Sequence, residues 1–165
     1  MRATARRTRD TSWIDKDNQF IDAFSRSRGL REPANSNAEL RRLREWLNEP
    51  VFAHRSSVRA CRVVIYVRTL PAQNPSLIFT TLRTEATQRG WHVGHELHDA
   101  IGQAAPQQCP QWLQARKFMH EGFADGVLVK DRNHISSYDD EYRYELHFVA
   151  ERQCFTALLV PEAAP

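Results

Sequence analysis

Four short strand-type segments alternate with helix-type segments from residue 61 onward, and this alternation limits the fold more than any other feature. Three of the strand-type segments are apolar runs and the fourth, 91–97, alternates along one face, whereas the segments between them show helical spacing and two of those stop at Gly90 and Gly122. This pattern predicts a three-layer α/β domain with a mostly parallel sheet of four to five strands and helices on both faces. We expect strands at 61–67, 91–97, 126–129 and 155–160, and helices at 74–90, 110–122 and 137–153.

The composition is that of a folded domain without a membrane span. Of the 165 residues, 41% are hydrophobic, and no stretch approaches the ~18 apolar residues of a membrane helix. The N-terminus is basic but lacks an apolar signal region, so we expect a cytoplasmic protein. Cys61, Cys109 and Cys154 form no CxxC pair, which indicates neither a disulfide framework nor a zinc site.

Positive charge is concentrated ahead of the predicted α/β domain. Residues 1–62 hold 14 Lys and Arg against 8 Asp and Glu, a net of +6, and residues 63–165 carry a net of −3. Basic arms are common in nucleic-acid-binding proteins. We expect residues 1–12 to be a disordered basic arm. Its candidate DNA contacts are Arg2, Arg6, Arg7 and Arg9.

Residues 13–58 are interpreted as a helical N-terminal extension. Residues 13–28 suit a short amphipathic helix and residues 29–37 have loop composition. A second helix is predicted over 37–48, ending before Pro50. It packs either on its own domain or on a second copy of the chain, through Leu40, Leu43, Trp46 and Leu47. On its other faces, three arginines are candidate DNA contacts: Arg41, Arg42 and Arg44.

Charged residues follow the predicted strands. Arg68 ends the first strand, Asp99 follows the second, and Asp131 and Arg132 follow the third. In parallel α/β sheets, ligands bind beyond the C-terminal ends of the strands. We therefore expect these side chains to converge on one edge of the sheet.

Four ordered motifs resemble the catalytic domain of serine recombinases, the resolvases and invertases. They are VVIYVRTL (63–70), RGWHVGHELHDAIG (89–102), EGFADGVLVKDRNH (121–134) and FTALLVPE (155–162), and the resemblance covers about residues 61–162. It implies a resolvase-like domain over 59–165. In that family a long helix and a DNA-binding domain follow the fourth strand, and we expect neither here.

The resemblance also implies a chemistry. Family members attack a DNA phosphate with a serine that closes a Tyr-x-Arg-x-Ser motif, and surrounding arginines bind the phosphate. A serine hydroxyl becomes an effective nucleophile when fixed cations neutralise the phosphate, and guanidinium binds two phosphate oxygens at once. Carried over by position, the phosphate- or anion-binding candidates are Tyr66, Arg68, Asp99 and Arg132.

The departures from the family pattern concern catalysis. The nucleophile position holds Leu70, which has no attacking oxygen, so no catalytic residue is assigned. The second arginine of the family's Asp-Arg-Leu-Ser-Arg stretch falls at Ile135. The arginine that precedes the middle helix is replaced by Cys109. We therefore expect the family chemistry to be lost.

Some of these candidate residues also have a purely structural interpretation. Arg68 either forms an anion pocket with Arg132 and Tyr66 or pairs with Asp99 or Asp131 in a structural salt bridge. Substitute nucleophiles are Thr69, which should leave the strand on the opposite side, and Ser76, Ser136 or Ser137, which are more simply first-turn or capping residues.

A cluster of histidines and a cluster of acidic residues are both expected to lie on the protein surface. His92 and His98 should share one strand face with Glu96, and His95 should point the other way. With no second ligand group in the sequence, we expect an exposed polar face and no metal or other cofactor. The acidic start of the helix at 137–153 is expected to be solvated and to favour the helix dipole; it holds Asp139, Asp140, Glu141 and Glu145.

Three functions remain open. The first is a catalytically inactive resolvase-like module that binds double-stranded DNA or a protein partner. The second is a divergent recombinase or phosphodiester-cleaving enzyme that uses Thr69 or another hydroxyl. The third is a structural or interaction protein whose helix at 37–48 forms a homodimer.

Overall fold

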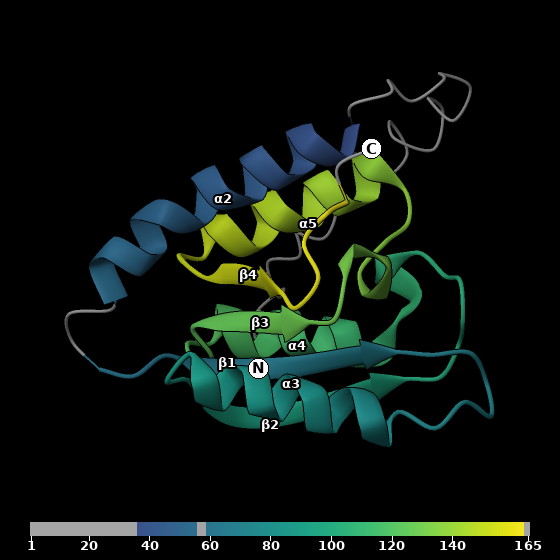
Figure 1. Cartoon of the computed structure of the whole chain (residues 1–165). Helices are drawn as coiled ribbons and strands as arrows, with labels where there is room; N and C mark the ends of the chain where they lie inside the picture. The colour runs from purple at the N-terminus through teal and green to yellow at the C-terminus, as the bar shows by residue number, and fades with distance from the viewer. Residues whose placement is uncertain (1–35, 56–58, 164–165) are drawn as a thin grey trace, which may run out of the picture. The chain divides into compact units, whose positions relative to one another are not determined.

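The computed structural model describes residues 36–55 and 59–163, which form a four-stranded, all-parallel α/β sheet with four α-helices (Figure 1). The strand order is β2-β1-β3-β4. The predicted α/β class and parallel sheet are thus confirmed. In chain order the elements are α2 (Ser36–Arg55), β1 (Arg62–Arg68), α3 (Ser76–Gln88), β2 (His92–Asp99), η1 (Pro106–Gln108), α4 (Pro110–His120), β3 (Gly126–Val129), η2 (Arg132–His134), α5 (Asp139–Glu151) and β4 (Phe155–Leu158).

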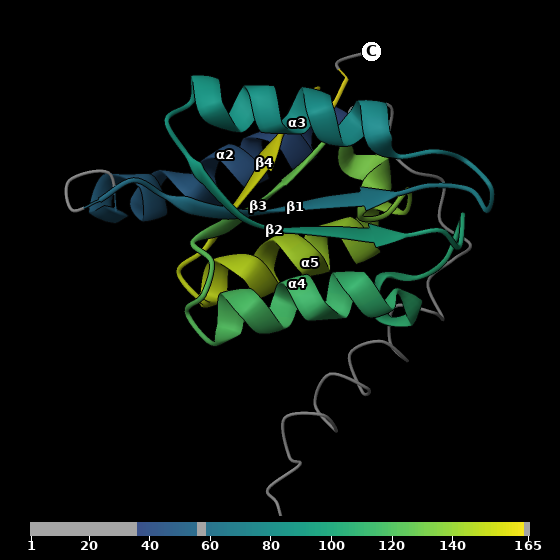
Figure 2. The same ribbon diagram turned by 90° about the horizontal axis from the view of Figure 1, so that it is seen from below.

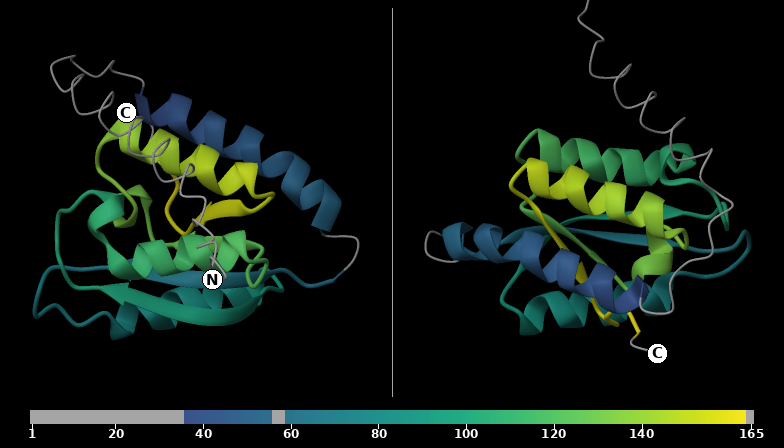
Figure 3. Two further views of the ribbon diagram at one scale, coloured as in Figure 1. Left: turned by 180° about the vertical axis from the view of Figure 1, so that it is seen from behind. Right: turned by 90° about the horizontal axis from the view of Figure 1, so that it is seen from above.

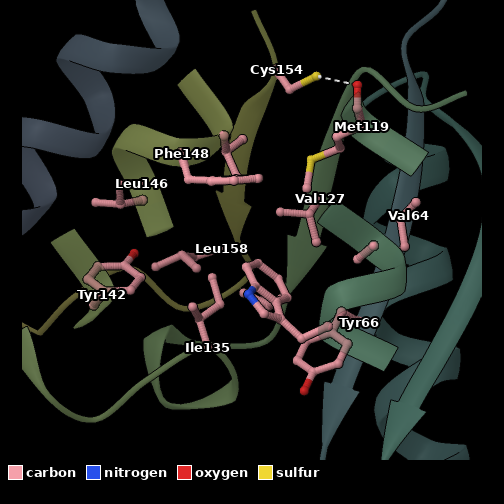
Figure 4. Packing of buried hydrophobic residues seen from close by; sticks show 14 of the residues in the cluster. Val64, Tyr66, Met119, Val127, Ile135, Tyr142, Leu146, Phe148, Cys154 and Leu158 are labelled. Atoms are coloured by element: carbon pink, nitrogen blue, oxygen red, sulfur yellow. Dashed lines mark hydrogen bonds between the residues drawn. The ribbon is translucent and has the colours of Figure 1, made fainter. Parts of the chain in front are cut away.

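Helices cover both faces of the sheet. Helix α3 lies on one face, and α4 and α5 lie on the other (Figure 2). Because side chains alternate along β1, Val64 and Tyr66 enter the core under α4 and α5, whereas Val63 and Ile65 enter the core under α3. Figure 4 shows the first core, in which aliphatic and aromatic side chains of β1, β3, α4, α5 and β4 interdigitate.

The predicted strand at 91–97 forms, but it contains an irregularity that the alternation concealed. Val63 pairs with Val93 and Val64 pairs with His95, so Gly94 is an extra residue in β2. The register pairs His92 with Arg62 and Glu96 with Ile65, and these β1 positions lie on opposite faces. The prediction that His92 shares a face with Glu96 and His98 is therefore wrong.

Helix α2 continues to Arg55, seven residues beyond the predicted end, with Pro50 inside it. Proline removes one helical hydrogen bond, but tertiary packing holds the following turn. Val51 is buried, and the ring of Phe52 packs 4.6 Å from that of Phe155, centroid to centroid. Local sequence rules alone gave the wrong helix end here.

The buried side of α2 is also rotated from the predicted one. Its buried residues are Leu40, Arg44, Asn48 and Val51, whereas the side chain of Trp46 is 67% exposed. Leu43 and Leu47 lie between these two sides and are half-buried. The spacing of apolar residues therefore located the helix but gave the wrong buried face, because the polar residues Arg44 and Asn48 are buried as well.

These two polar residues attach α2 to the open edge of the sheet. The Asn48 side chain donates to the carbonyl of Thr156 at 2.7 Å and accepts from its amide at 3.0 Å, as a neighbouring strand would. Arg44 makes two 2.9 Å hydrogen bonds to the carboxylate of Glu162. Helix α2 therefore closes the β4 edge and packs along α5, as Figure 1 shows.

The compact unit that contains the sheet runs from Pro33 to Pro165 and includes α2. The basic arm at 1–12 and the predicted helix at 13–28 lie outside the described residues. Every helix in the described ranges is too short or too polar to cross a bilayer.

Candidate functional site

The parallel register places Arg68, the last residue of β1, beside Asp99, the last residue of β2. The loop after β3 reaches the same edge, since the amide of Arg68 donates to Nδ1 of His134 at 3.0 Å. The predicted convergence of strand ends therefore occurs for β1, β2 and β3.

Asp99 is buried and caps a helix. Its carboxylate accepts 3.0 Å hydrogen bonds from the Tyr66 hydroxyl and from the amides of Gln111 and Trp112 in the first turn of α4. A carboxylate at a helix N-terminus satisfies free amides and complements the helix dipole. Asp99 therefore joins the ends of β1 and β2 to α4, and its oxygens face inward.

Tyr66 supports Asp99 from the core. Its ring is fully buried and lies 5.1 Å from the ring of Trp112, centroid to centroid. Burial raises the pKa of the Tyr66 hydroxyl, and the nearby Cys109 thiol and Asp99 carboxylate raise it further. The phenol therefore stays protonated and donates to Asp99.

Arg68 has a different environment. Its guanidinium donates to two backbone carbonyls, those of Ala104 at 2.7 Å and Asn133 at 2.6 Å. Its other side-chain contact is with Cys109 Sγ at 3.8 Å, and no carboxylate in the described ranges pairs with it, so the alternative salt bridge to Asp99 or Asp131 does not form there. Carbonyls orient the guanidinium without cancelling its charge. Arg68 is therefore a half-buried cation without a carboxylate partner among the described residues.

His134 is a site residue that sequence reasoning missed. Burial lowers the pKa of its imidazole, and the charges of Lys130 and Arg68 lower it further, against an opposing effect of Asp131. The neutral ring presents Nδ1 as an acceptor to the amide of Arg68. Its position two residues after Arg132, in the same quoted motif, was the available signal.

Arg132 is directed away from this cation, into the packing of α2 and α5. Its guanidinium donates to Asn37 Oδ1 at 2.8 Å, to Asp139 Oδ1 at 2.5 Å and to the carbonyl of Ser137 at 2.9 Å. It also lies 5.1 Å from the centre of the Tyr142 ring. The guanidinium of Arg132 is therefore engaged in contacts within the domain.

The acidic start of α5 is partly buried, contrary to the solvated face expected from sequence. Asp139 pairs with Arg132, and Glu145 lies 3.6 Å from Arg116 with almost no exposed surface. Both carboxylates entered the core because arginines from other segments reach them, a fact that helix position alone does not reveal.

Leu70, where the motif resemblance implies a serine, lies on the surface. The Leu70 side chain is 59% exposed and lies beside Gly102 in the loop after β2. Gly102 has a φ of +66°, and a Cβ there would come within 3.1 Å of Leu70 Cδ2. The two other departures give no cation either, because Cys109 and Ile135 have side chains that cannot carry a positive charge, and both are buried.

The hydroxyl groups considered as substitute nucleophiles differ in burial and in hydrogen-bond partners. Thr69 is 4% exposed, and its Oγ1 is hydrogen-bonded to His98 Nε2 at 2.8 Å on the α3 side of the sheet. Ser136 is buried and donates to Glu141 at 2.7 Å. Ser76 lies at the exposed start of α3, where its amide donates to the Asn74 side chain. None of them makes a hydrogen bond to Arg68.

The histidines of β2 are separated by their partners. His95 stacks on Phe118 at 3.9 Å between ring centroids, His98 contacts Thr69, and Glu96 forms an ion pair with Arg83 of α3. Within residues 36–55 and 59–163, no three His, Cys, Asp or Glu residues form a group able to hold a metal ion.

The predicted DNA-contacting arginines of α2 have three different environments. Arg44 is buried against Glu162, which corrects its expected surface position, because it lies one turn after Leu40 on the packed side. Arg41 pairs with Glu45 at 2.8 Å on the surface, and Arg42 is exposed. The arginines of the basic arm lie outside the described residues.

Comparison with known proteins connects this geometry to one fold. No protein-family model matches the sequence, and no curated protein does. The structure is similar to the C-terminal catalytic domain of ISC1926 TnpA, an IS607-like serine recombinase, at 23% identity and a TM-score of 0.53 over 61% of this chain and 71% of that one. It is also similar to the N-terminal catalytic domain of TP901-1 integrase, at 20% identity and a TM-score of 0.53 over 59% and 76% of the two chains. The resemblance seen in the motifs is thereby confirmed at the level of fold: this chain has the fold of the serine recombinase catalytic domains.

Proposed function

We propose that this protein is a catalytically inactive serine-recombinase-like protein that acts as a DNA-associated or regulatory binding module. The observation that carries the proposal is the exposed Leu70, two residues after Arg68, at the position where the family motif places its serine. A leucine there supplies no oxygen for attack on phosphate. The cation beside it is retained, so the strand ends keep a means of binding an anion.

The proposed DNA contact combines Arg68 with the basic arm. Arg68 is oriented by neutral carbonyls and keeps its full charge, which suits a phosphate oxygen. Tyr66, Asp99 and His134 hold the strand ends around it. Arg2, Arg6, Arg7 and Arg9 add charge that needs no fixed geometry, because phosphate attraction is largely independent of sequence.

A second candidate, an enzyme that uses Thr69, has one observation in its favour. A hydroxyl hydrogen-bonded to an imidazole at 2.8 Å is the arrangement of a nucleophile with its base. However, Thr69 is buried and faces α3, whereas the guanidinium of Arg68 bonds to the loops after β2 and β3. The nucleophile and the anion-binding cation therefore do not share a substrate position.

The test is binding of a fluorescent duplex, followed by anisotropy at low and at physiological salt. We expect affinity that falls steeply with salt. It should weaken about two- to tenfold in Arg68→Gln and more after removal of residues 1–12. Arg143→Gln is the matched control, because Arg143 is an exposed arginine on α5 and its loss changes the net charge equally. Equal weakening in both variants, or no binding at low salt, would refute the DNA contact at Arg68.

The proposed lack of catalytic activity is tested in a separate assay. We expect no covalent protein–DNA adduct on a denaturing gel and no nicking of supercoiled plasmid. An adduct in the wild type that disappears in Thr69→Val would instead establish the enzyme.

A further inference from the structure

The outward side of α2 carries an exposed tryptophan between two exposed residues of opposite charge. Trp46 is 67% exposed on a helix that lies on the outside of the domain, over α5 and β4 (Figure 3). Arg42 and Glu49 lie about one turn before and after it, and both are exposed. Neither forms an ion pair with another residue in the described part of the chain, whereas their neighbours Arg41 and Glu45 pair with each other. Trp46, Arg42 and Glu49 all lie outside the buried set of α2, which is Leu40, Arg44, Asn48 and Val51.

The three residues form one stripe. Successive helical residues are about 100° apart, so Arg42 and Glu49 both lie within about 60° of Trp46 around the helix axis. The buried residues Leu40, Arg44 and Val51 lie on nearly the opposite side. A large aromatic flanked by opposite charges is typical of interaction surfaces, in which tryptophan is often the energetic centre.

We propose that this stripe, Arg42–Trp46–Glu49, is a homodimer contact in which the α2 helices of two chains cross antiparallel about a two-fold axis at Trp46. A two-fold interface requires a surface that is complementary to itself. This stripe meets that requirement, because it carries a cation at one end, an anion at the other and an apolar side chain at the centre.

The helix repeat gives the pairing. At about 1.5 Å per residue, Arg42 lies about 6 Å from the axis and Glu49 about 4.5 Å from it on the other side. In the antiparallel arrangement, each Arg42 is therefore within about 1.5 Å of the level of the opposite Glu49. Two symmetric ion pairs then flank the two tryptophans. A parallel arrangement would instead place Arg42 beside Arg42 and Glu49 beside Glu49.

The expected dimer is weak. A single pair of crossing helices buries less than the ~1,200 Å² of a standard stable interface. Association should therefore be visible by sedimentation equilibrium of the full-length chain between about 1 µM and about 1 mM. We expect Trp46→Ala to raise the dissociation constant about 30-fold or more. Leu77→Ala is the matched control, since Leu77 is an exposed hydrophobic residue on α3, and it should leave association unchanged.

Charge exchange tests the antiparallel geometry. Arg42→Glu and Glu49→Arg should each weaken association, because each places like charges opposite one another twice. The double variant R42E/E49R should return to within about threefold of the wild type. The control exchange R41E/E45R reverses a pair within one helix and should have no effect.

The outcomes decide the proposal independently of DNA binding, because no DNA is present. A wild-type chain that stays monomeric to about 1 mM overturns it. So does a dimer that survives Trp46→Ala, or a double charge variant no better than the single ones. Circular dichroism melting of each variant ensures that loss of association is not loss of folding.

Discussion

Two arginines, Arg68 and Arg44, show how one residue type serves opposite purposes in this molecule. Arg68, at the strand ends, is held by two backbone carbonyls and keeps its charge. Arg44, on α2, is buried and gives both arms of its guanidinium to Glu162, which also accepts a hydrogen bond of 2.5 Å from the Tyr142 hydroxyl. A neutral acceptor leaves a cation available to a ligand, whereas a buried carboxylate makes it part of the core.

The largest expected effect follows removal of Glu162. Glu162→Ala leaves the Arg44 charge buried without its partner, which should lower the free energy of unfolding by about 3–5 kcal/mol. Urea denaturation provides the measurement. Glu45→Ala removes the partner of exposed Arg41 on the same helix and should cost no more than about 0.5 kcal/mol. Similar losses in the two variants would mean that burial does not distinguish these pairs.

The next effect concerns the closed edge of the sheet. Asn48→Ala leaves the buried amide and carbonyl of Thr156 without their side-chain partner. We expect a loss of about 1–3 kcal/mol in the same assay. Glu49→Gln, at the adjacent exposed position, should change stability by less than about 0.5 kcal/mol. A neutral result for Asn48→Ala would argue that α2 is held to β4 by apolar contacts alone.

Acid should destabilise both regions, in two separate pH windows. Burial depresses the pKa of His134, so the unfolded chain takes up its proton first and stability falls as pH decreases below about 6.5. Although burial by itself raises the pKa of Glu162, hydrogen bonds from Arg44 and Tyr142 lower it overall. Its stabilisation is therefore present above the ordinary glutamate value of about 4.3 and is lost as pH falls through the depressed pKa.

Two variants isolate these windows in melting curves recorded from pH 8 to pH 3. His134→Asn keeps an acceptor for the amide of Arg68 and should flatten the upper window. Glu162→Gln should flatten the lower one. A His134→Asn profile with the wild-type slope near pH 6 would remove His134 as its cause.

The smallest effect is expected at Leu70, where the proposed function places the loss of a nucleophile. Leu70→Ser exchanges an exposed side chain and should change stability by less than about 0.5 kcal/mol. We expect no covalent DNA adduct from this variant, because Arg132 is paired with Asp139 and neither Cys109 nor Ile135 supplies a cation. An adduct on a denaturing gel would mean that loss of the serine alone had abolished the reaction.

Much of the fold was predictable because its signals are local. The strand–helix alternation located the four strands of the described residues and the three helices between them. The apolar runs of β1, β3 and β4 are buried on both faces, whereas β2, at the edge of the sheet, is mostly exposed or half-buried. The end of α2 was not predictable, since Pro50 argued for a stop and the packing of Phe52 against Phe155 held the helix. The bulge at Gly94 depends on the pairing of β1 with β2, and strand composition does not report it.

The candidate site divides in the same way. Its position was predictable because parallel strands end at one edge, and the absence of a serine at Leu70 is visible in the sequence itself. The roles of the charged residues were not. Arg68 and Arg132 each follow a strand, yet one contacts carbonyls and the other contacts Asp139.

The sequence by itself determined the α/β class, the order of the strands and helices along the chain, and the leucine at position 70, because each of these depends on local patterns or on identity alone. Tertiary structure decided that Arg44 pairs with a carboxylate and Arg68 with backbone carbonyls, which side of α2 faces solvent and where that helix ends. Such outcomes depend on partners 60 to 120 residues away, such as Asn133 for Arg68 and Glu162 for Arg44, which are brought near by the fold.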